Sequence, residues 1–405
     1  MRVHVWGINY APEPTGIGPH NTALCEHLAR RGHDVKMFTS FAYYPAWKKS
    51  DADRGRLWRT DSINGVAVHR CWHFVPRHPS AMKRIFHEAT FVLTSLVCVL
   101  AAPRADVMVV VSPPLLLGVA AWFVDAIKRA PFVFHVQDLQ PDAAVGLGMI
   151  RVGWFVRLLY GLEAFAYRKA ARVSGISAGT LDVFAGKNVA REKLVLFPNG
   201  VRIPPPEEMR RTNRFRARHG FSGDDFLAVY SGNFGVKQGL RILLDAARRV
   251  SDPRVRVVLC GEGGGRPALE SAVADAGLKN VTILPLQTDS DYREMLADAD
   301  VCLIPQQAGS GGAFFPSKLL PSLAFGKPVV TVADAGSQLV RELDAGGFGR
   351  NVPPGDSVAL ARELDALAQQ PGQLAQFSAA ARRHAEQWEC GAVLADFERV
   401  LVSLA

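Results

Sequence analysis

The sequence predicts an α/β protein made of two Rossmann-like domains, each built around a parallel β-sheet. Short runs of β-branched residues alternate along the whole chain with longer segments of helical period, a pattern typical of parallel sheets covered by helices. The pattern occurs in two blocks that a proline-rich segment separates. A chain of 405 residues is also too long for one ordinary domain and favours two or three.

Each block contributes its own set of strands. In the first block we expect strands at residues 3–7, 35–39, 66–71, 107–112, 132–136, 173–176 and 194–197. In the second block we expect strands at residues 226–231, 255–260, 281–284, 301–304 and 329–332. Helical segments separate most of these runs, so neighbouring strands should pair in parallel.

The segment 197–206 marks the boundary between the domains. Asn199 and Gly200 form a turn signal, and the three prolines at 204–206 prevent both a helix and a central strand. We therefore expect an N-terminal domain at 1–200, a linker at 201–210 and a C-terminal domain at 211–384. A last helix at 379–402 is expected to cross back, so that residues 385–405 pack on the first domain. Two facing domains would bring the carboxyl ends of their strands, where ligands bind, around one cleft.

Composition restricts the compartment and the partners. Six scattered cysteines show no spacing for a metal or redox site, which fits a reducing compartment. The N-terminus lacks the features of a signal peptide, and the longest apolar run, 89–102, is too short to span a membrane. We expect a cytoplasmic protein without a transmembrane helix. The net charge of +9 favours an anionic membrane surface or phosphorylated substrates, whereas nucleic acid has least support because no binding signature occurs.

A glycine-rich loop in the second block, residues 309–315, predicts a phosphate site. Glycines such as Gly312 let backbone amides turn toward an anion. Pro316 suits the first turn of the helix that follows, and Lys318 adds a positive charge beside Ser317 at the helix start. The stretch therefore indicates a nucleotide-like ligand, although a plain loop before an ordinary helix has the same sequence features.

Three further loops follow strands of the second block. A lysine in the loop 230–239 can meet the same anion as Lys318, because both lysines follow strands of one predicted sheet. Backbone groups in the loops 260–265 and 284–287 can contact a nucleotide or read the edge of its base, and the alternative for both is a tight turn. The candidate ligand residues in the three loops are Asn233 and Lys237, Gly261 and Glu262, and Gln287.

The first block has its own glycine loop at residues 7–20. Gly16 and Gly18 can bring backbone amides close to a phosphate or a sugar. The loop lacks Gly-x-Gly-x-x-Gly spacing and the next strand lacks a terminal acidic residue, so an NAD-dependent oxidoreductase is disfavoured. Asp138 follows the strand 132–136 and can orient or deprotonate a hydroxyl. His135 lies inside that strand, where a histidine is more often part of the core.

Neither a metal nor an integral membrane segment is expected. Two Asp-Ala-Asp triplets lie at 51–53 and 298–300, and the second closes a helix before a strand, so we expect its acids to cap local structure. Two apolar stripes with basic flanks, 77–104 and 154–169, can lie on anionic lipid. Such stripes are also typical of core faces, so peripheral membrane contact stays one of two alternatives.

Several short motifs are specific in their order and spacing. With them the chain resembles the GT4 family of retaining GT-B glycosyltransferases, in particular its branch of colanic acid biosynthesis enzymes, nearly from end to end. The motifs are Tyr10-Ala-Pro with Thr15-Gly-Ile-Gly18, Arg31-Gly-His-Asp-Val35, Val136-Gln-Asp-Leu-Gln-Pro141, Pro198-Asn-Gly-Val201, Ser231-Gly-Asn-Phe-Gly-Val-Lys-Gln-Gly239, Ala299-Asp-Val301, and Pro316-Ser-Lys-Leu-Leu320 before Gly326-Lys-Pro-Val329.

The resemblance implies a GT-B fold with two facing Rossmann-like domains and transfer of a sugar, with retention, from a GDP- or UDP-linked donor. The C-terminal domain would hold the donor, and the departing diphosphate would be stabilised by Lys237 and Lys318. Ser317, Leu319 and Leu320 would contact its phosphate and ribose. Beyond the donor as co-substrate, no cofactor and no metal are implied.

The N-terminal domain would hold the acceptor, a glycan or a polyprenyl-linked glycan at the inner face of the cytoplasmic membrane. Tyr10 and Gln137 are expected on the acceptor side, and Asp138 would position the sugar or the acceptor.

The chain departs from the family pattern at two places. The usual glutamate pair would fall near Ala313 and Pro321, yet no glutamate occurs between Met295 and Arg341. Gln137 stands where many members have histidine. The missing glutamates motivate one alternative, a catalytically silent subunit that binds nucleotide sugar. A nucleotide-sugar epimerase or hydrolase on the same fold is a second alternative.

Overall fold

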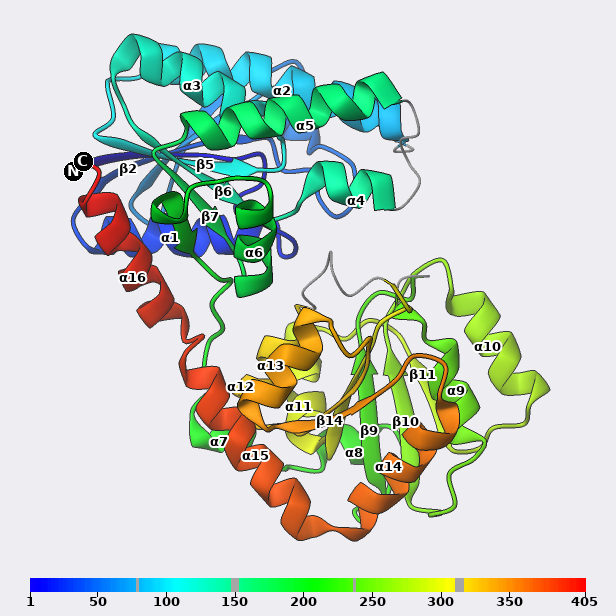
Figure 1. Cartoon of the computed structure of the whole chain (residues 1–405). Coiled ribbons are helices and arrows are strands. Elements are labelled where there is room, and N and C mark those ends of the chain that lie inside the picture. Colours follow the sequence, from blue (N-terminus) through cyan, green and yellow to red (C-terminus); the bar gives the residue numbers. More distant parts are fainter. Residues whose placement is uncertain (78–79, 147–152, 236–237, 310–316) are drawn as a thin grey trace. The chain divides into compact units, whose positions relative to one another are not determined.

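The computed structural model describes residues 1–77, 80–146, 153–235, 238–309 and 317–405. The chain divides into two compact units. Unit 1 contains Met1–Gly200 together with Gly391–Ala405, and unit 2 contains Val201–Cys390. Each unit has its own sheet (Figure 1). Each also has its own buried core of apolar side chains.

Unit 1 is built on an eight-stranded sheet in the order β3-β4-β2-β1-β5-β6-β7-β8, in which only the β3–β4 pair is antiparallel. Its strands are β1 (Arg2–Trp6), β2 (Asp34–Ser40), β3 (Trp58–Ile63), β4 (Val66–Cys71), β5 (Val107–Ser112), β6 (Phe132–Val136), β7 (Arg172–Gly175) and β8 (Leu194–Leu196). Its helices are α1 (Gly18–Arg30), α2 (Ala81–Ala101), α3 (Leu116–Lys128), α4 (Gln140–Gly146), α5 (Gly153–Lys169), α6 (Ala178–Gly186) and α16 (Cys390–Val402).

Unit 2 is built on a six-stranded parallel sheet in the order β11-β10-β9-β12-β13-β14. Its strands are β9 (Phe226–Ser231), β10 (Val255–Cys260), β11 (Val281–Leu284), β12 (Val301–Pro305), β13 (Val329–Val332) and β14 (Gly349–Val352). Its helices are α7 (Pro206–Met209), α8 (Arg214–Arg218), α9 (Arg241–Ala247), α10 (Arg266–Asp275), α11 (Asp289–Asp298), α12 (Leu319–Ala324), α13 (Gln338–Gly346), α14 (Ser357–Gln369) and α15 (Pro371–Glu386).

The expected strands are all present, and the parallel pairing is confirmed. β5 and β6 form the centre of the first core because every residue in them is buried. Two edge strands were not expected. β3 alternates half-buried and exposed side chains and joins β4 through Asn64 and Gly65, both with positive φ. β14 is short and carries Arg350 and Asn351.

Three helices of unit 1 lie together on one face of its sheet. Figure 1 shows α2, α3 and α5 side by side, and α3 packs against both of the other two. The face of α2 toward the sheet is apolar, with Phe91 and Val99 buried in the core. The opposite face of α2 is not covered within unit 1, since Leu93 is 65% exposed.

The expectation of one continuous last helix is wrong. α15 ends at Glu386 and α16 begins at Cys390. Between them Glu389 forms a β-bridge with Val201. Val201 N donates to Trp388 O at 2.8 Å, and Val201 O accepts from Cys390 N at 3.0 Å. The chain therefore bonds to the linker at this point instead of continuing the helix.

Helix α16 packs on unit 1, to which it belongs. The Glu398 carboxylate contacts His27 Nε2 at 3.0 Å and His33 Nε2 at 2.9 Å, both from the region of α1. The ring of Phe397 stacks on Phe197 with centroids 3.8 Å apart. The last turns of the chain thus complete the core of the first unit.

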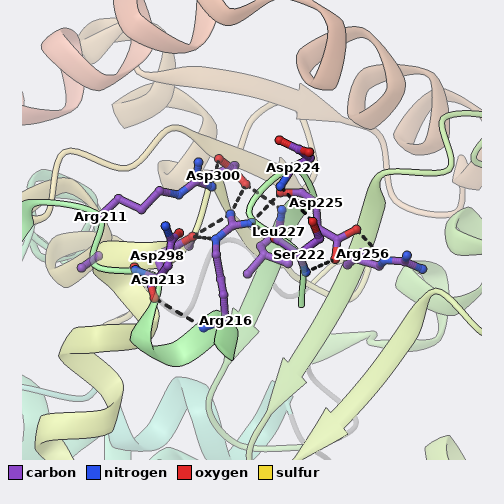
Figure 2. A network of polar contacts seen from close by, with 12 residues as sticks. Arg211, Asn213, Arg216, Ser222, Asp224, Asp225, Leu227, Arg256, Asp298 and Asp300 are labelled. Atoms are coloured by element: carbon purple, nitrogen blue, oxygen red, sulfur yellow. Dashed lines mark hydrogen bonds and ion pairs between the residues drawn. The ribbon is translucent and has the colours of Figure 1, made fainter. Parts of the chain in front are cut away.

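The second Asp-Ala-Asp triplet anchors the amino ends of the strands in unit 2 (Figure 2). The fully buried Asp298 accepts hydrogen bonds from Thr212 N, Asn213 N and Phe215 N at 2.8 to 2.9 Å, which caps α8. Arg216, 1% exposed, donates to Asp298 O and to the Asp300 carboxylate at 2.6 Å. Asp298 is thus a cap, but of a helix 83 to 86 residues away in sequence and not of the local structure that was expected, and Asp300 instead pairs with Arg216.

Candidate functional site

A lysine and two glycine loops meet at the carboxyl edge of the second sheet. Lys318 lies at the start of α12, and its Nζ donates to Tyr230 Oη at 3.0 Å and lies 4.6 Å from the centre of that ring. Tyr230 Oη in turn donates to the backbone oxygen of Asn233 at 2.7 Å. The side chain of Lys318 is therefore directed to the loop that follows β9.

Glycine is required at this meeting point. Gly232 has φ of 141°, and a Cβ there would overlap Cε of Lys318 and lie 2.9 Å from its Nζ. A Cβ at Gly261 would overlap the backbone oxygen of Gly232. The loops after β9 and β10 and the lysine can thus approach one another only because two side chains are missing.

Lys318 is a poorly solvated cation. Burial lowers its pKa from 10.5 to about 8. Within the ranges that the structure describes, no carboxylate forms an ion pair with Lys318. A half-buried ammonium that has no carboxylate partner among the described residues is suited to an anion, because an anionic ligand would restore the solvation that burial removed.

The other residues of unit 2 that are predicted to bind the donor have side chains with local partners, so mainly their main-chain atoms are available for a ligand. Glu262 is engaged by Arg266, and the backbone oxygen of Glu262 accepts from Phe234 N at 2.8 Å, which ties the two loops together. Gln287 Nε2 donates to Pro285 O at 2.8 Å. Contacts of these two residues with a nucleotide would therefore use the main chain or displace a local bond.

The start of α12 is partly buried. Leu319 and Leu320 are 1% and 6% exposed, so their side chains belong to the core and only their backbone can meet a donor, whereas Ser317 is exposed. Gly309 N donates to Asp334 Oδ2 at 2.7 Å, which fixes the beginning of the glycine-rich loop. Lys237 and Gly312 lie outside the described residues, so their roles stay predictions.

In unit 1, a buried carboxylate holds the glycine loop after β1. Glu13 Oε1 accepts from the backbone N of Tyr43 and Tyr44, both at 3.0 Å, and Oε2 accepts from Asn9 Nδ2 at 2.8 Å. Sequence reasoning missed Glu13, although an acid inside a glycine loop was a signal. Gly16, with φ of 72°, is exposed in this loop, while Gly18 is buried at the start of α1.

The polar residues after β6 form a fixed network. Gln137 and Asn199 exchange amide hydrogen bonds at 2.9 and 3.0 Å, and Gln137 Nε2 lies 2.9 Å from His135 Nε2. Burial lowers the pKa of His135 to about 3, and its other ring nitrogen meets Ser174 Oγ at 2.9 Å. His135 is thus a neutral core histidine, as expected. Asp138 is exposed just beyond this network.

Tyr10 is placed differently from its expected role. Its ring is 1% exposed and belongs to the core of unit 1. A side chain in that position does not reach an acceptor, so only the backbone of Tyr10 can serve the acceptor side.

The described part of the chain contains no group of three or more His, Cys, Asp or Glu side chains that could hold a metal ion. It contains one helical segment, Met82–Ala101, that is long and apolar enough to cross a membrane by length and composition. Core helices of soluble proteins pass the same test, and 28% of that segment is buried.

Two Rossmann-like units, with a desolvated lysine and glycine loops at the carboxyl edge of one sheet, define a two-domain protein of the nucleotide-binding class. A model of the glycosyl transferase 4-like domain matches residues 15–200, and a model of glycosyl transferases group 1 matches residues 211–384. The chain belongs to the GT4 family of glycosyltransferases.

Individual relatives agree with this assignment. WcaI of Escherichia coli (strain K12), whose name describes a colanic acid biosynthesis glycosyl transferase, is 33% identical over 347 residues, which cover 84% of this chain and 85% of WcaI. Sucrose-phosphate synthase from Thermosynechococcus elongatus has a TM-score of 0.77 at 18% identity and covers 100% of this chain and 98% of that one. HepE from Anabaena, solved with UDP, has a TM-score of 0.70 at 17% identity over the whole of both chains. The GT-B fold is confirmed.

Proposed function

We propose that the protein transfers a sugar, with retention of anomeric configuration, from a GDP- or UDP-linked donor to a glycan or polyprenyl-linked acceptor in the synthesis of a cell-surface polysaccharide. The observation that carries the proposal is the half-buried Lys318 between glycine loops at the carboxyl edge of the second sheet, which forms no ion pair with any residue that the structure describes. The name of WcaI supports a role in polysaccharide synthesis. The complex of HepE with UDP-glucose supports a nucleoside diphosphate sugar as the donor.

In the proposed mechanism, unit 2 binds the donor and stabilises the charge that develops on its leaving group. Lys318, the loop amides and Lys237 would hold the diphosphate as the bond between the sugar and phosphate breaks. The acceptor hydroxyl would attack from the leaving-group face, its oxygen forming the new bond while its proton passes to a phosphate oxygen. Asp138 would position the sugar or the acceptor. The two lysines supply the positive charge, so we propose transfer without a metal.

Replacement of Lys318 tests the donor site. Lys318→Ala should lower turnover about 100-fold or more, because one preorganised charge at the leaving group is lost. Lys318→Arg should retain part of the wild-type turnover. Lys279→Ala, at an exposed lysine of the same unit, should retain all of the wild-type turnover. Release of nucleoside diphosphate and of labelled product measures the effect. Full turnover by Lys318→Ala would show that Lys318 does not belong to the donor site.

The same assay separates the proposed reaction from its alternatives. Nuclear magnetic resonance of the first-formed product should show the anomeric configuration of the donor, and added EDTA should leave the rate unchanged. Donor consumption that does not depend on an acceptor would indicate a hydrolase or an epimerase. Tight nucleotide binding without any transfer by the purified chain would indicate a silent subunit.

We further propose that unit 1 makes peripheral contact with an anionic membrane. Helix α2 exposes Met82, Phe86, Leu93 and Val97 by 55 to 74%. Their spacing places them on one stripe of the helix. Lys83 and Arg84, both exposed, stand at the amino end of this stripe. An apolar stripe with basic residues at its end is the chemistry that anionic lipid binds.

A further inference from the structure

A polar cluster at the carboxyl edge of the first sheet is not used by the proposed donor chemistry. Glu88 lies on α2 and is half-buried. Its Oε1 accepts a hydrogen bond from Gln140 Nε2 at 2.9 Å, at the start of α4. Gln140 Oε1 accepts from Leu115 N at 2.7 Å. Because both ends of the amide are bonded, Gln140 fixes the carboxylate beyond the ends of β5 and β6.

The Glu88 carboxylate has unused hydrogen-bonding capacity. A carboxylate can accept about four hydrogen bonds. Over the described ranges, Gln140 is the one hydrogen-bond partner found for it, and no ion pair reaches it. Burial raises its pKa to about 7, and Gln140 and Arg84 only partly oppose this effect. Half-buried carboxylates are normally better satisfied, so the second oxygen has hydrogen-bonding capacity left for a ligand hydroxyl.

A cation on the same helix interacts with this carboxylate and also lies over an aromatic ring. Arg84 lies one turn before Glu88 on the same face of α2, and its guanidinium is 5.4 Å from the ring centre of Trp47. Trp47 follows β2 and packs with its ring 5.4 Å from both Tyr43 and His87. Its φ of 51° lies in the left-handed region, which is costly for a bulky residue and occurs mainly where function retains it.

These features match the chemistry of a sugar ring. A pyranose offers an apolar face to an aromatic ring and hydroxyl donors to a carboxylate, and sites for such ligands combine aromatic lining with a few fixed polar groups. Gln140, the first residue of α4, lies two positions after Asp138, the residue predicted to position the sugar or the acceptor. The cluster is therefore on the predicted acceptor domain and next in sequence to its expected polar residue.

We propose that Glu88, positioned by Gln140, binds hydroxyls of the acceptor's terminal pyranose, with Trp47 against the apolar face of that ring. The assignment rests on the proposed transferase function. It names the class of acceptor, which is a glycan whose reactive end is a neutral sugar with free ring hydroxyls. Glu88 then determines which acceptor is used and does not act on the donor.

The test measures acceptor binding without requiring turnover. Octyl glycosides of common hexoses and their monodeoxy analogues serve as probes, and saturation-transfer difference spectra of the full chain with UDP or GDP report their binding. Wild-type protein should bind one glycoside and lose about 10- to 100-fold in affinity when one ring hydroxyl is removed, the effect of a hydrogen bond to a charged group. Glu88→Gln should bind more weakly and no longer distinguish that deoxy analogue.

Two further variants keep the result decisive. Glu192→Gln, at an exposed glutamate of the same unit, should behave as wild type. Gln140→Leu should weaken glycoside binding while nucleotide affinity stays unchanged, which also covers the case in which Glu88→Gln fails to fold. Absence of glycoside binding by wild type, or undiminished discrimination by Glu88→Gln, would overturn the inference. Glycoside binding that depends on Glu88 without any transfer would instead reject the proposed function and leave the acceptor site standing.

Discussion

The charge of Lys318 depends on pH in a range that is accessible to experiment. Its pKa is lowered from 10.5 to about 8 by burial, so the free protein loses this charge as the pH rises through 8. A bound diphosphate favours the charged form and would raise that pKa, so binding should take up a proton near pH 8 to 9.

Nucleoside diphosphate affinity should therefore fall above pH 8. Calorimetric titration of UDP and GDP between pH 7 and 9.5, in buffers of different ionisation enthalpy, measures the affinity and the proton uptake together. Lys318→Arg should remove the pH dependence, because a guanidinium stays charged throughout this range. The pKa of Lys327 is also lowered to about 8, but its Nζ donates to Ala297 O and Ala299 O. If the affinity of Lys318→Arg fell with pH as it does in the wild type, Lys318 would not be part of the anion site.

Individual site residues were predictable only where the local sequence carries the signal. Lys318 follows a glycine-rich loop and precedes a helix, so its place at a sheet edge could be inferred from neighbours in the chain. The hydrogen-bond partners of Glu13 and Glu88 could not be found in this way, because Tyr43 and Gln140 lie 30 and 52 residues away. The burial of Tyr10 likewise depends on the packing of distant elements.

The start of helix α8 is capped by one buried carboxylate. The helix has five residues and no side-chain cap of its own, and Asp298 instead accepts from the backbone at its start. Asp298→Ala should leave these amides buried without partners and destabilise the protein by on the order of 3 kcal/mol. Asp344→Ala, at an exposed aspartate on α13, should leave the unfolding midpoint almost unchanged.

Urea unfolding followed by circular dichroism measures the difference between these two variants. Nucleotide affinity of the folded Asp298→Ala protein should equal that of wild type, because the network lies at the amino ends of β9 and β12 while the lysine site lies at the opposite ends. Equal stability of the two variants would contradict the anchoring role.

Elements with a strong apolar signal were predicted well, and polar edge elements were not. Buried strands such as β5 and β10 are apolar runs rich in valine, whereas β3 is a polar edge strand whose one sequence signal is the Asn64-Gly65 turn that follows it. The last helix was predicted as continuous because residues 387–389 contain no helix breaker. The break comes from pairing with Val201, a long-range contact that helical periodicity does not encode.

At the scale of the whole molecule, the net charge of +9 and the apolar stripe of α2 contribute differently to membrane contact. The charge attracts anionic lipid over a distance that salt shortens from about 30 Å at 0.01 M to about 10 Å at 0.1 M. The stripe acts only on contact and is nearly independent of salt. Both contributions are needed for stable binding if neither is large alone.

The two contributions can be separated by sedimentation with phosphatidylglycerol vesicles. Wild-type protein should bind at low salt and lose most of its binding at 0.5 M, on the order of tenfold, and it should bind phosphatidylcholine vesicles poorly. Val97→Glu should abolish binding even at low salt, because it places a charge within the apolar stripe. Val402→Glu makes the same change at a residue that is also 55% exposed, on α16, and should bind as wild type. If Val97→Glu and Val402→Glu lost binding equally, net charge alone would account for the binding. If both variants bound as well as the wild type, α2 would not be part of the membrane contact.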